Sequence, residues 1–172
     1  PSPRKIHTKP VPRLGGLAII ITVIGLVLAY SFASQRLSFT AFHVWVFDKR
    51  LLGALIGAGI LLIIGIIDDV WGMKPWQKLI GHILAASMVV VFGLSIDYVR
   101  FFGNQVVYLN HLTLPIALFG YNYTFVVWGD LLTIFWIVLL INTMNFLDGL
   151  DGLATGVSLI AGLSLFFLSL SL

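Results

Sequence analysis

Long apolar segments separated by short polar ones dominate the chain. The apolar segments lie at 14–34, 51–67, 79–96, 129–147 and 153–172. Each is close to the roughly twenty residues that a helix needs to cross the hydrocarbon core of a bilayer. The strands of a membrane barrel are much shorter than these segments. The pattern therefore predicts an all-α fold, a polytopic transmembrane helical bundle with about five spans in this chain.

The polar segment at 97–128 is too long to be a tight turn between two spans. Residues 98–102 and 105–108 are rich in aromatic and β-branched side chains, and Gly103 with Asn104 lies between them. Such runs around a glycine-containing pair are typical of two paired strands and their turn. We therefore expect a short external β-hairpin in this segment.

Composition agrees with a membrane protein. The chain of 172 residues is 59% hydrophobic and 10% charged, with a mean hydropathy of +1.05, whereas soluble domains are about 25% charged. We interpret the small net charge of +3 as loop charge near lipid headgroups, and we expect no nucleic-acid partner. The absence of cysteine excludes a disulfide framework, a thiolate metal site and a thiol nucleophile.

The two ends of the chain suggest a fragment. The sequence begins at Pro1 without a methionine, and it ends at Leu172 inside an apolar run. We therefore expect residues 1–172 to be a single membrane domain from the N-terminal and middle part of a larger protein, truncated at both ends.

The first polar segment indicates the orientation in the membrane. Residues 1–13 are rich in proline and hold four basic side chains, Arg4, Lys5, Lys9 and Arg13. The positive-inside rule places this segment in the cytoplasm. It also places 68–78 and 145–153 in the cytoplasm, and 35–50 and 97–128 outside. A simple juxtamembrane anchor remains an equally open interpretation of the basic residues themselves.

Four polar side chains recur at a spacing of three near the end of the fourth span: Asn142, Asn145, Asp148 and Asp151. On a helix, residues three apart stay adjacent on one face. Oxygen-bearing side chains that converge at the edge of a span are typical of a site for a hard cation or a polar ligand. Helix capping is the alternative, but it explains one or two such residues and not four.

Two adjacent carboxylates, Asp68 and Asp69, end the second span. Their charges repel each other and also meet the negative end of the helix dipole. A positive partner is therefore expected, and Lys74, Lys78 or a bound Mg²⁺ are the candidates. The alternative is a solvated turn that stops the span.

The predicted topology places these polar segments on one membrane face. A transporter concentrates its ionisable residues near the midplane, in broken helices, whereas an enzyme acting on a lipid headgroup needs them at the interface. Carboxylates beside basic residues, without cysteine, favour Mg²⁺-assisted phosphoryl transfer over zinc chemistry. A transporter or flippase for a lipid-linked sugar and a membrane scaffold remain the alternative functions.

Other polar residues are expected to be structural. Asp130 follows Gly129 at a span start and is predicted to be an N-cap. His82 is predicted to be a packed or interfacial histidine. The charged triplet at 48–50 is predicted to be a solvated flank.

These segments resemble the polyprenyl-phosphate N-acetylhexosamine-1-phosphate transferases of glycosyltransferase family 4. Three motifs carry the resemblance. Arg4-Lys5-Ile6-His7 with 10–16 is similar to the family's first cytoplasmic loop, Asp68-Asp69 to its aspartate pair, and 142–154 to its asparagine and double Asp-Gly signature. Their order and their spacing between spans also fit.

The resemblance implies a bundle of about ten spans with an external hairpin. It implies transfer of a sugar-1-phosphate from a UDP-sugar to undecaprenyl phosphate, with release of UMP and with Mg²⁺, or alternatively Mn²⁺, as cofactor. The enzyme would lie in the cytoplasmic (inner) membrane with its active site facing the cytoplasm, as a possible homodimer. It would begin a lipid-linked cell-wall, teichoic-acid or lipopolysaccharide pathway. The Arg-Lys-x-His loop resembles the branch that uses UDP-N-acetylglucosamine.

The resemblance also implies roles for individual residues. Asp68 and Asp69 would be catalytic, positioning or deprotonating the lipid phosphate. Asn145 and Asp148 would hold the metal. Substrate-binding roles would fall to Arg4, Lys5, His7, Asn142 and Asp151. The chain lacks the family's later spans, a further acidic metal-binding residue and a His-rich loop, and we therefore expect activity to require the larger protein.

Overall fold

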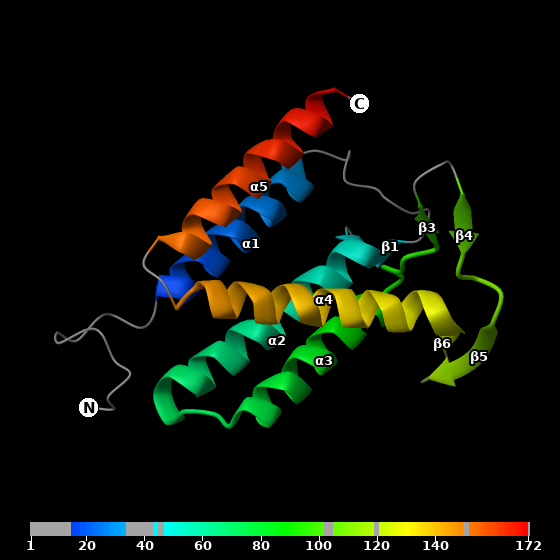
Figure 1. Cartoon of the computed structure of the whole chain (residues 1–172), viewed down its shortest axis with the longest axis horizontal. Coiled ribbons are helices and arrows are strands. Elements are labelled where there is room, and N and C mark those ends of the chain that lie inside the picture. Colours follow the sequence, from blue (N-terminus) through cyan, green and yellow to red (C-terminus); the bar gives the residue numbers. More distant parts are fainter. Residues whose placement is uncertain are drawn as a thin grey trace, which may run out of the picture. The chain divides into compact units, whose positions relative to one another are not determined.

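The computed structural model describes residues 15–33, 43–44, 47–101, 105–118, 121–149 and 152–171. Helices account for most of them (Figure 1). The helices are α1 (Gly15–Ala33), α2 (Lys49–Trp71), α3 (Pro75–Val91), α4 (Val127–Leu147) and α5 (Leu153–Leu170). They coincide closely with the predicted spans, so the prediction of a helical membrane bundle is confirmed.

Three of the described helices, α2, α4 and α5, are long and apolar enough to cross a membrane. Helix α3 and the apolar stretch Ala18–Tyr30 within α1 are shorter. By their contacts the residues form two compact units, Pro1–Ile134 and Phe135–Leu172, and the boundary lies within α4. The expectation of a single membrane domain over 1–172 stays a prediction.

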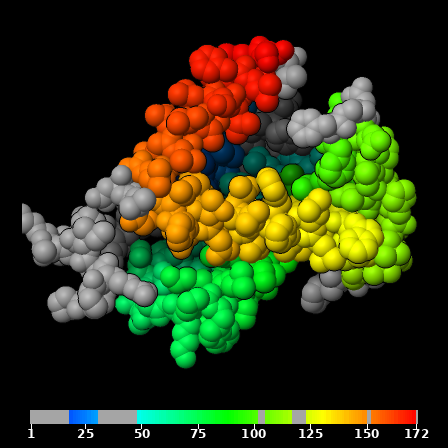
Figure 2. All heavy atoms as spheres, viewed as in Figure 1, coloured from blue at the N-terminus to red at the C-terminus, as the bar shows by residue number. Residues whose placement is uncertain are grey.

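In the first unit, α2 and α3 pack side by side as an antiparallel pair, and their atoms form one continuous mass in the space-filling view (Figures 1 and 2). Two glycines of α2 allow the close approach. A Cβ added at Gly53 would lie 2.3 Å from Phe92 Cβ, and one at Gly57 would lie 2.9 Å from Val89 Cγ2. This pair therefore has the packing role that a small-xxx-small motif gives glycines in membrane helices.

A three-residue turn joins α2 to α3. Gly72 adopts φ 72°, and its N–H donates to the Asp68 carbonyl oxygen at 2.9 Å. Glycine suits this position because residues with a side chain rarely adopt a positive φ. Lys74 is the N-cap of α3, Pro75 is the first residue of the helix, and the Lys74 N–H donates to Gln77 Oε1 at 2.8 Å. This turn brings the end of α2 and the start of α3 close together.

Strands occur in the segment between α3 and α4 (Figure 1). Strand β3 (Tyr98–Arg100) pairs with β4 (Val106–Tyr108), with Tyr98 opposite Tyr108. The predicted hairpin is thereby confirmed, although residues 102–104 at its expected turn lie outside the described residues, and its external position stays a prediction. A second hairpin, β5 (Thr113–Leu118) with β6 (Tyr121–Val126), was not predicted. A further pair, β1 (His43–Val44) and β2 (Phe47–Asp48), precedes α2.

A buried carboxylate fastens the second hairpin to the helices. Asp130 is 1% exposed, and its Oδ2 accepts hydrogen bonds from Tyr123 Oη at 2.5 Å and from the Val126 N–H at 2.9 Å. Burial and the Asp130 carboxylate raise the pKa of Tyr123, so the phenol stays protonated and keeps donating. Since α4 begins at Val127, the predicted N-cap role of Asp130 is wrong. Its side chain lies in the first turn and reaches back to the strand.

Two other expectations for polar residues have different outcomes. Asp48 was expected in a solvated flank, but it is 2% exposed, and as N-cap of α2 its side chain accepts from the Arg50 N–H at 2.8 Å. The prediction was therefore wrong for Asp48, because it ignored the unsatisfied N–H groups of the helix that starts there, whereas Arg50 is exposed as expected. His82 is 8% exposed on α3, which confirms it as a packed histidine.

Candidate active site

The aspartate pair lies in the last turn of α2, beside the turn to α3. Lys78 Nζ on α3 lies 2.6 Å from Asp68 Oδ2. The Met73 N–H donates to the other oxygen of the same carboxylate, Asp68 Oδ1, at 2.9 Å. The expectation of a positive partner is confirmed for Asp68, and this partner is Lys78.

These contacts fix the orientation of Asp68. One oxygen is held by a backbone N–H of the turn and the other by an ammonium group, and both charged side chains are about 30% exposed. The Asp68 carboxylate thus lies at the surface of the helix pair, partly exposed. Asp69 is also partly exposed, but successive residues on a helix point about 100° apart. The two carboxylates therefore leave the helix in different directions.

The second polar group lies at the end of α4. Asn142 and Asn145 are exposed on the helix, and Asp148 is exposed in the turn that follows it. The Asn142 Nδ2 donates to the Val138 carbonyl oxygen at 2.7 Å. The Asn142 Oδ1 is the atom of this side chain that can accept a hydrogen bond or coordinate a cation. The Asp148 N–H donates to the Met144 carbonyl oxygen at 3.0 Å, which extends the helical path to the carboxylate.

The electrostatics of this helix end favour a cation. Asp148 places a carboxylate where the helix dipole is already negative, and such a charge is unfavourable without a positive partner. Gly149 follows, and its N–H donates to the Phe146 carbonyl oxygen at 3.3 Å in a tighter last turn. A bound cation or a basic group would offset this accumulation of negative charge.

The predicted site residues therefore fall into separate groups. The first unit brings together Asp68, Asp69 and Lys78, and the second holds Asn142, Asn145 and Asp148. The remaining predicted residues, Arg4, Lys5, His7 and Asp151, lie outside the described residues. Convergence of all these residues in one pocket stays a prediction.

The exposed polar side chains at the end of α4 carry hard oxygen atoms, the type of ligand that Mg²⁺ prefers. No group of three or more histidine or acidic side chains occurs within the described ranges, so these ranges hold no complete protein cage. Mg²⁺ usually takes one or two carboxylates and completes its shell with water and substrate phosphates. Asp148 supplies one carboxylate and Asn145 one amide oxygen of this type.

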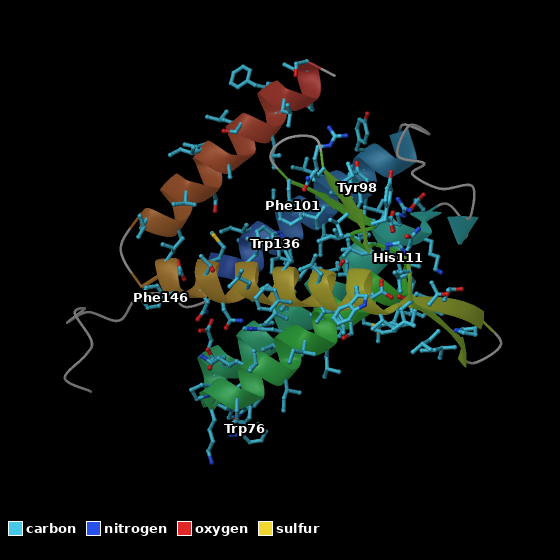
Figure 3. The ribbon with its side chains drawn as sticks, turned by 45° about the vertical axis from the view of Figure 1, so that its right-hand side comes forward. Trp76, Tyr98, Phe101, His111, Trp136 and Phe146 are labelled. Carbon is cyan, nitrogen blue, oxygen red and sulfur yellow. The ribbon has the colours of Figure 1, made fainter. Side chains whose placement is uncertain are left out.

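Exposed aromatic side chains accompany both polar groups. Trp71 at the end of α2 is 76% exposed, Trp76 at the start of α3 is 59% exposed, and Phe146 near the end of α4 is 84% exposed. Trp76 and Phe146 project from their helices in the stick view (Figure 3). Aromatic side chains are enriched where membrane helices meet the headgroup region. The polar groups therefore lie at helix ends that have the character of a membrane interface.

Lys78 contacts Asp68 but was not among the predicted site residues. It was expected only as one of the candidates to neutralise the aspartate pair. The glycine and proline around 72–75 are the signal that could have assigned it, because a short turn there returns the chain so that Lys78 faces Asp68.

These features define an integral membrane protein of the helical class, with its ionisable and amide side chains gathered at helix ends. Residues 51–172 match the glycosyl transferase family 4. The chain belongs to that family, which confirms the resemblance found in the motifs.

Relatives with assigned names support the same family. The chain is 35% identical over its whole length to the decaprenyl-phosphate N-acetylglucosaminephosphotransferase of Mycolicibacterium smegmatis, of which it covers 38%. It is 35% identical to the probable undecaprenyl-phosphate N-acetylglucosaminyl 1-phosphate transferase of Bacillus subtilis, with 95% of the chain and 38% of that protein covered. It is 32% identical to the phospho-N-acetylmuramoyl-pentapeptide-transferase of Lactobacillus gasseri, with 91% and 45% covered.

The chain thus spans less than half of the length of these relatives. No solved structure gave a significant match.

Proposed function

We propose that the chain is part of a membrane enzyme that transfers N-acetylglucosamine-1-phosphate, or a related sugar-1-phosphate, from a UDP-sugar to undecaprenyl phosphate. The observation that carries the proposal is the fixed Asp68 carboxylate at the turn between α2 and α3, in a chain of this family. The relatives' names supply the class of reaction, since all three name a transferase and two name a polyprenyl-phosphate acceptor.

In the proposed reaction, an oxygen of the lipid phosphate attacks the phosphorus that bears the sugar. A new P–O bond joins sugar phosphate to lipid phosphate, the diphosphate bond of the UDP-sugar breaks, and UMP leaves. Asp68 and Asp69 would position the lipid phosphate and accept its proton where it is still protonated. Arg4, Lys5 and His7 would bind phosphate oxygens, and Asn142 and Asp151 would contact the nucleotide.

Asn145 and Asp148 would hold Mg²⁺, or Mn²⁺ in its place. When bound, the ion would withdraw charge from the diphosphate and favour departure of UMP. The fit of hard oxygen donors at an exposed helix end supports this proposal.

The length of α4 fits a single crossing of the bilayer. The antiparallel pair of α2 and α3 places Asp68 at one end and the hairpins at the other, and Gly129 in α4 packs against Ser95 and Ile96 at the hairpin end. A helix of 21 residues extends about 30 Å, which is the thickness of the hydrocarbon core. That Asn145 and Asp148 lie at the same membrane face as Asp68 is part of our proposal and follows from the predicted topology.

We propose that this face is the cytoplasmic face of the inner membrane, because the basic segment 1–13 adjoins it in the predicted topology. The UDP-sugar would then reach the site from the cytoplasm, and the polyprenyl phosphate from the bilayer. The product would be the first lipid-linked intermediate of a cell-wall or surface polysaccharide.

The test is release of UMP by the purified full-length protein that contains this chain. The protein is given undecaprenyl or decaprenyl phosphate and, separately, UDP-N-acetylglucosamine, UDP-N-acetylgalactosamine or the UDP-muramoyl-pentapeptide, with Mg²⁺, Mn²⁺ or EDTA. We expect UMP from UDP-N-acetylglucosamine and its loss with EDTA. UMP release from the UDP-muramoyl-pentapeptide alone would assign the enzyme to the branch of the family that uses this substrate. Movement of a lipid-linked sugar across vesicles without any UMP would instead indicate a flippase.

A further inference from the structure

The hairpin of β5 and β6 has two chemically different faces. Directly opposed residues of an antiparallel pair lie on the same face. In the observed register Leu114 is opposite Phe125 and Ile116 is opposite Tyr123, so these four apolar or aromatic side chains share one face. The other face carries the hydroxyl groups of Thr113 and Thr124, together with the side chains of Pro115 and Val126. None of the four residues on the first face is charged.

The apolar face is the one turned toward the helices. Tyr123 belongs to this face, and its hydroxyl donates to Asp130 on α4 at 2.5 Å and approaches the Val90 carbonyl oxygen of α3 at 3.5 Å. A hairpin whose apolar face meets the ends of membrane helices directs that face toward the bilayer. The opposite face, with its threonines, is directed away from the bilayer.

The helix ends do not cover the whole apolar face. Leu114 remains 49% exposed and Ile116 remains 37% exposed, while Tyr123 and Phe125 are partly covered. Trp128, in the first turn of α4, is 59% exposed. Adjoining apolar side chains of this kind on a protein surface mark a binding surface.

The chain itself indicates what covers the remainder. Strand β6 ends at Val126 and α4 begins at Val127, so no loop separates the hairpin from a helix long and apolar enough to cross a membrane. The uncovered part of the face therefore belongs to a hairpin that is joined directly to this helix. Trp128 at this junction is the type of residue that sits at the level of lipid headgroups.

We propose that the hairpin of β5 and β6 is seated in the membrane interface, with Leu114 and Ile116 inserted among the lipids and the face of Thr113 and Thr124 in water. The occupant of the apolar face is the bilayer leaflet nearest the hairpin. The hydrogen bonds of Asp130 connect this lipid-seated hairpin to the start of α4. The inference is independent of the proposed transferase activity.

The test uses single cysteines, because the chain has none of its own. Leu114→Cys, Ile116→Cys, Thr113→Cys and Thr124→Cys are made one at a time in the full-length protein, with cysteines elsewhere replaced. Each carries a nitroxide spin label in liposomes of phosphatidylethanolamine and phosphatidylglycerol. Collisions of the label with oxygen, which concentrates in lipid, are compared with collisions with a water-soluble nickel chelate.

We expect labels at 114 and 116 to collide preferentially with oxygen, and the matched labels at 113 and 124 to collide preferentially with nickel. Equal access of nickel to both faces would overturn the proposal. Shielding of 114 and 116 from both reagents would also overturn it, because protein would then cover the face. If the Leu114 variant does not reconstitute, Ile116→Cys gives the same comparison with Thr124→Cys.

Discussion

Replacing Asp68 with asparagine is expected to lower transfer of the sugar-1-phosphate by roughly 10²–10³-fold, or about 2.7–4 kcal/mol of activation free energy. Asparagine has the same shape, and its amide oxygen can still accept the hydrogen bond that the Met73 N–H now gives to Asp68. The turn between α2 and α3 therefore persists, while the negative charge is lost. The measurement is the rate of UMP release by purified full-length Asp68→Asn protein.

Two further variants show whether the charge itself acts on the substrate. Asp97→Asn makes the same exchange at an exposed aspartate beyond the other end of α3, and we expect it to leave the rate unchanged. Lys78→Gln removes only the partner in a partly exposed ion pair, which is worth about 1 kcal/mol at most, or roughly fivefold in rate. If Lys78→Gln costs as much as Asp68→Asn, the carboxylate acts through the geometry of the turn and not on the lipid phosphate.

Replacing Asp148 with asparagine is expected to reduce transfer by a similar factor of roughly 10²–10³, since it removes the carboxylate proposed to hold the metal. The amide keeps the hydrogen-bonding shape at the end of α4 but binds Mg²⁺ far more weakly. We therefore also expect the variant to need a higher Mg²⁺ concentration for its residual activity. The measurement is UMP release across a Mg²⁺ titration, and Asp97→Asn again serves as the control.

Near-normal UMP release by Asp148→Asn at every Mg²⁺ concentration would remove Asp148 from the mechanism. A loss of rate with no change in the Mg²⁺ requirement would separate Asp148 from the metal but leave it at the site. Membrane insertion of the variant, measured by reconstitution into liposomes, should equal that of the unaltered protein, because Asp148 lies in an exposed turn.

The helices were predictable because a bilayer imposes a length on each apolar segment. The hairpin of β3 and β4 was predictable from its strand-forming residues around Gly103 and Asn104. The second hairpin was missed, since Pro115 argues against a strand that is paired on both sides and Thr113 to Val126 directly precede a span. A pair of strands with no third neighbour accommodates that proline.

For the polar residues, nearby sequence predicts some contacts, whereas others depend on how distant segments pack. A positive partner for Asp68 was predictable, because two like charges lie together at a helix end. The structure shows that Lys78 is this partner. The burial of Asp130 could not be predicted, because it depends on strand β6, whose Tyr123 and Val126 donate to its carboxylate. The same limit applies to the grouping of Asn145 and Asp148 with Asp68, which depends on how membrane helices associate.

The proposal of a shared pocket rests on the ends of α2 and α4 meeting at one membrane face. Pulsed electron resonance between nitroxide labels at Trp71→Cys and Phe146→Cys tests this most directly, since both side chains are highly exposed. In the full-length protein in liposomes, we predict a separation well below the roughly 30 Å thickness of the hydrocarbon core. A separation at or above that thickness would place the two groups on opposite faces or far apart, and it would contradict a common active site.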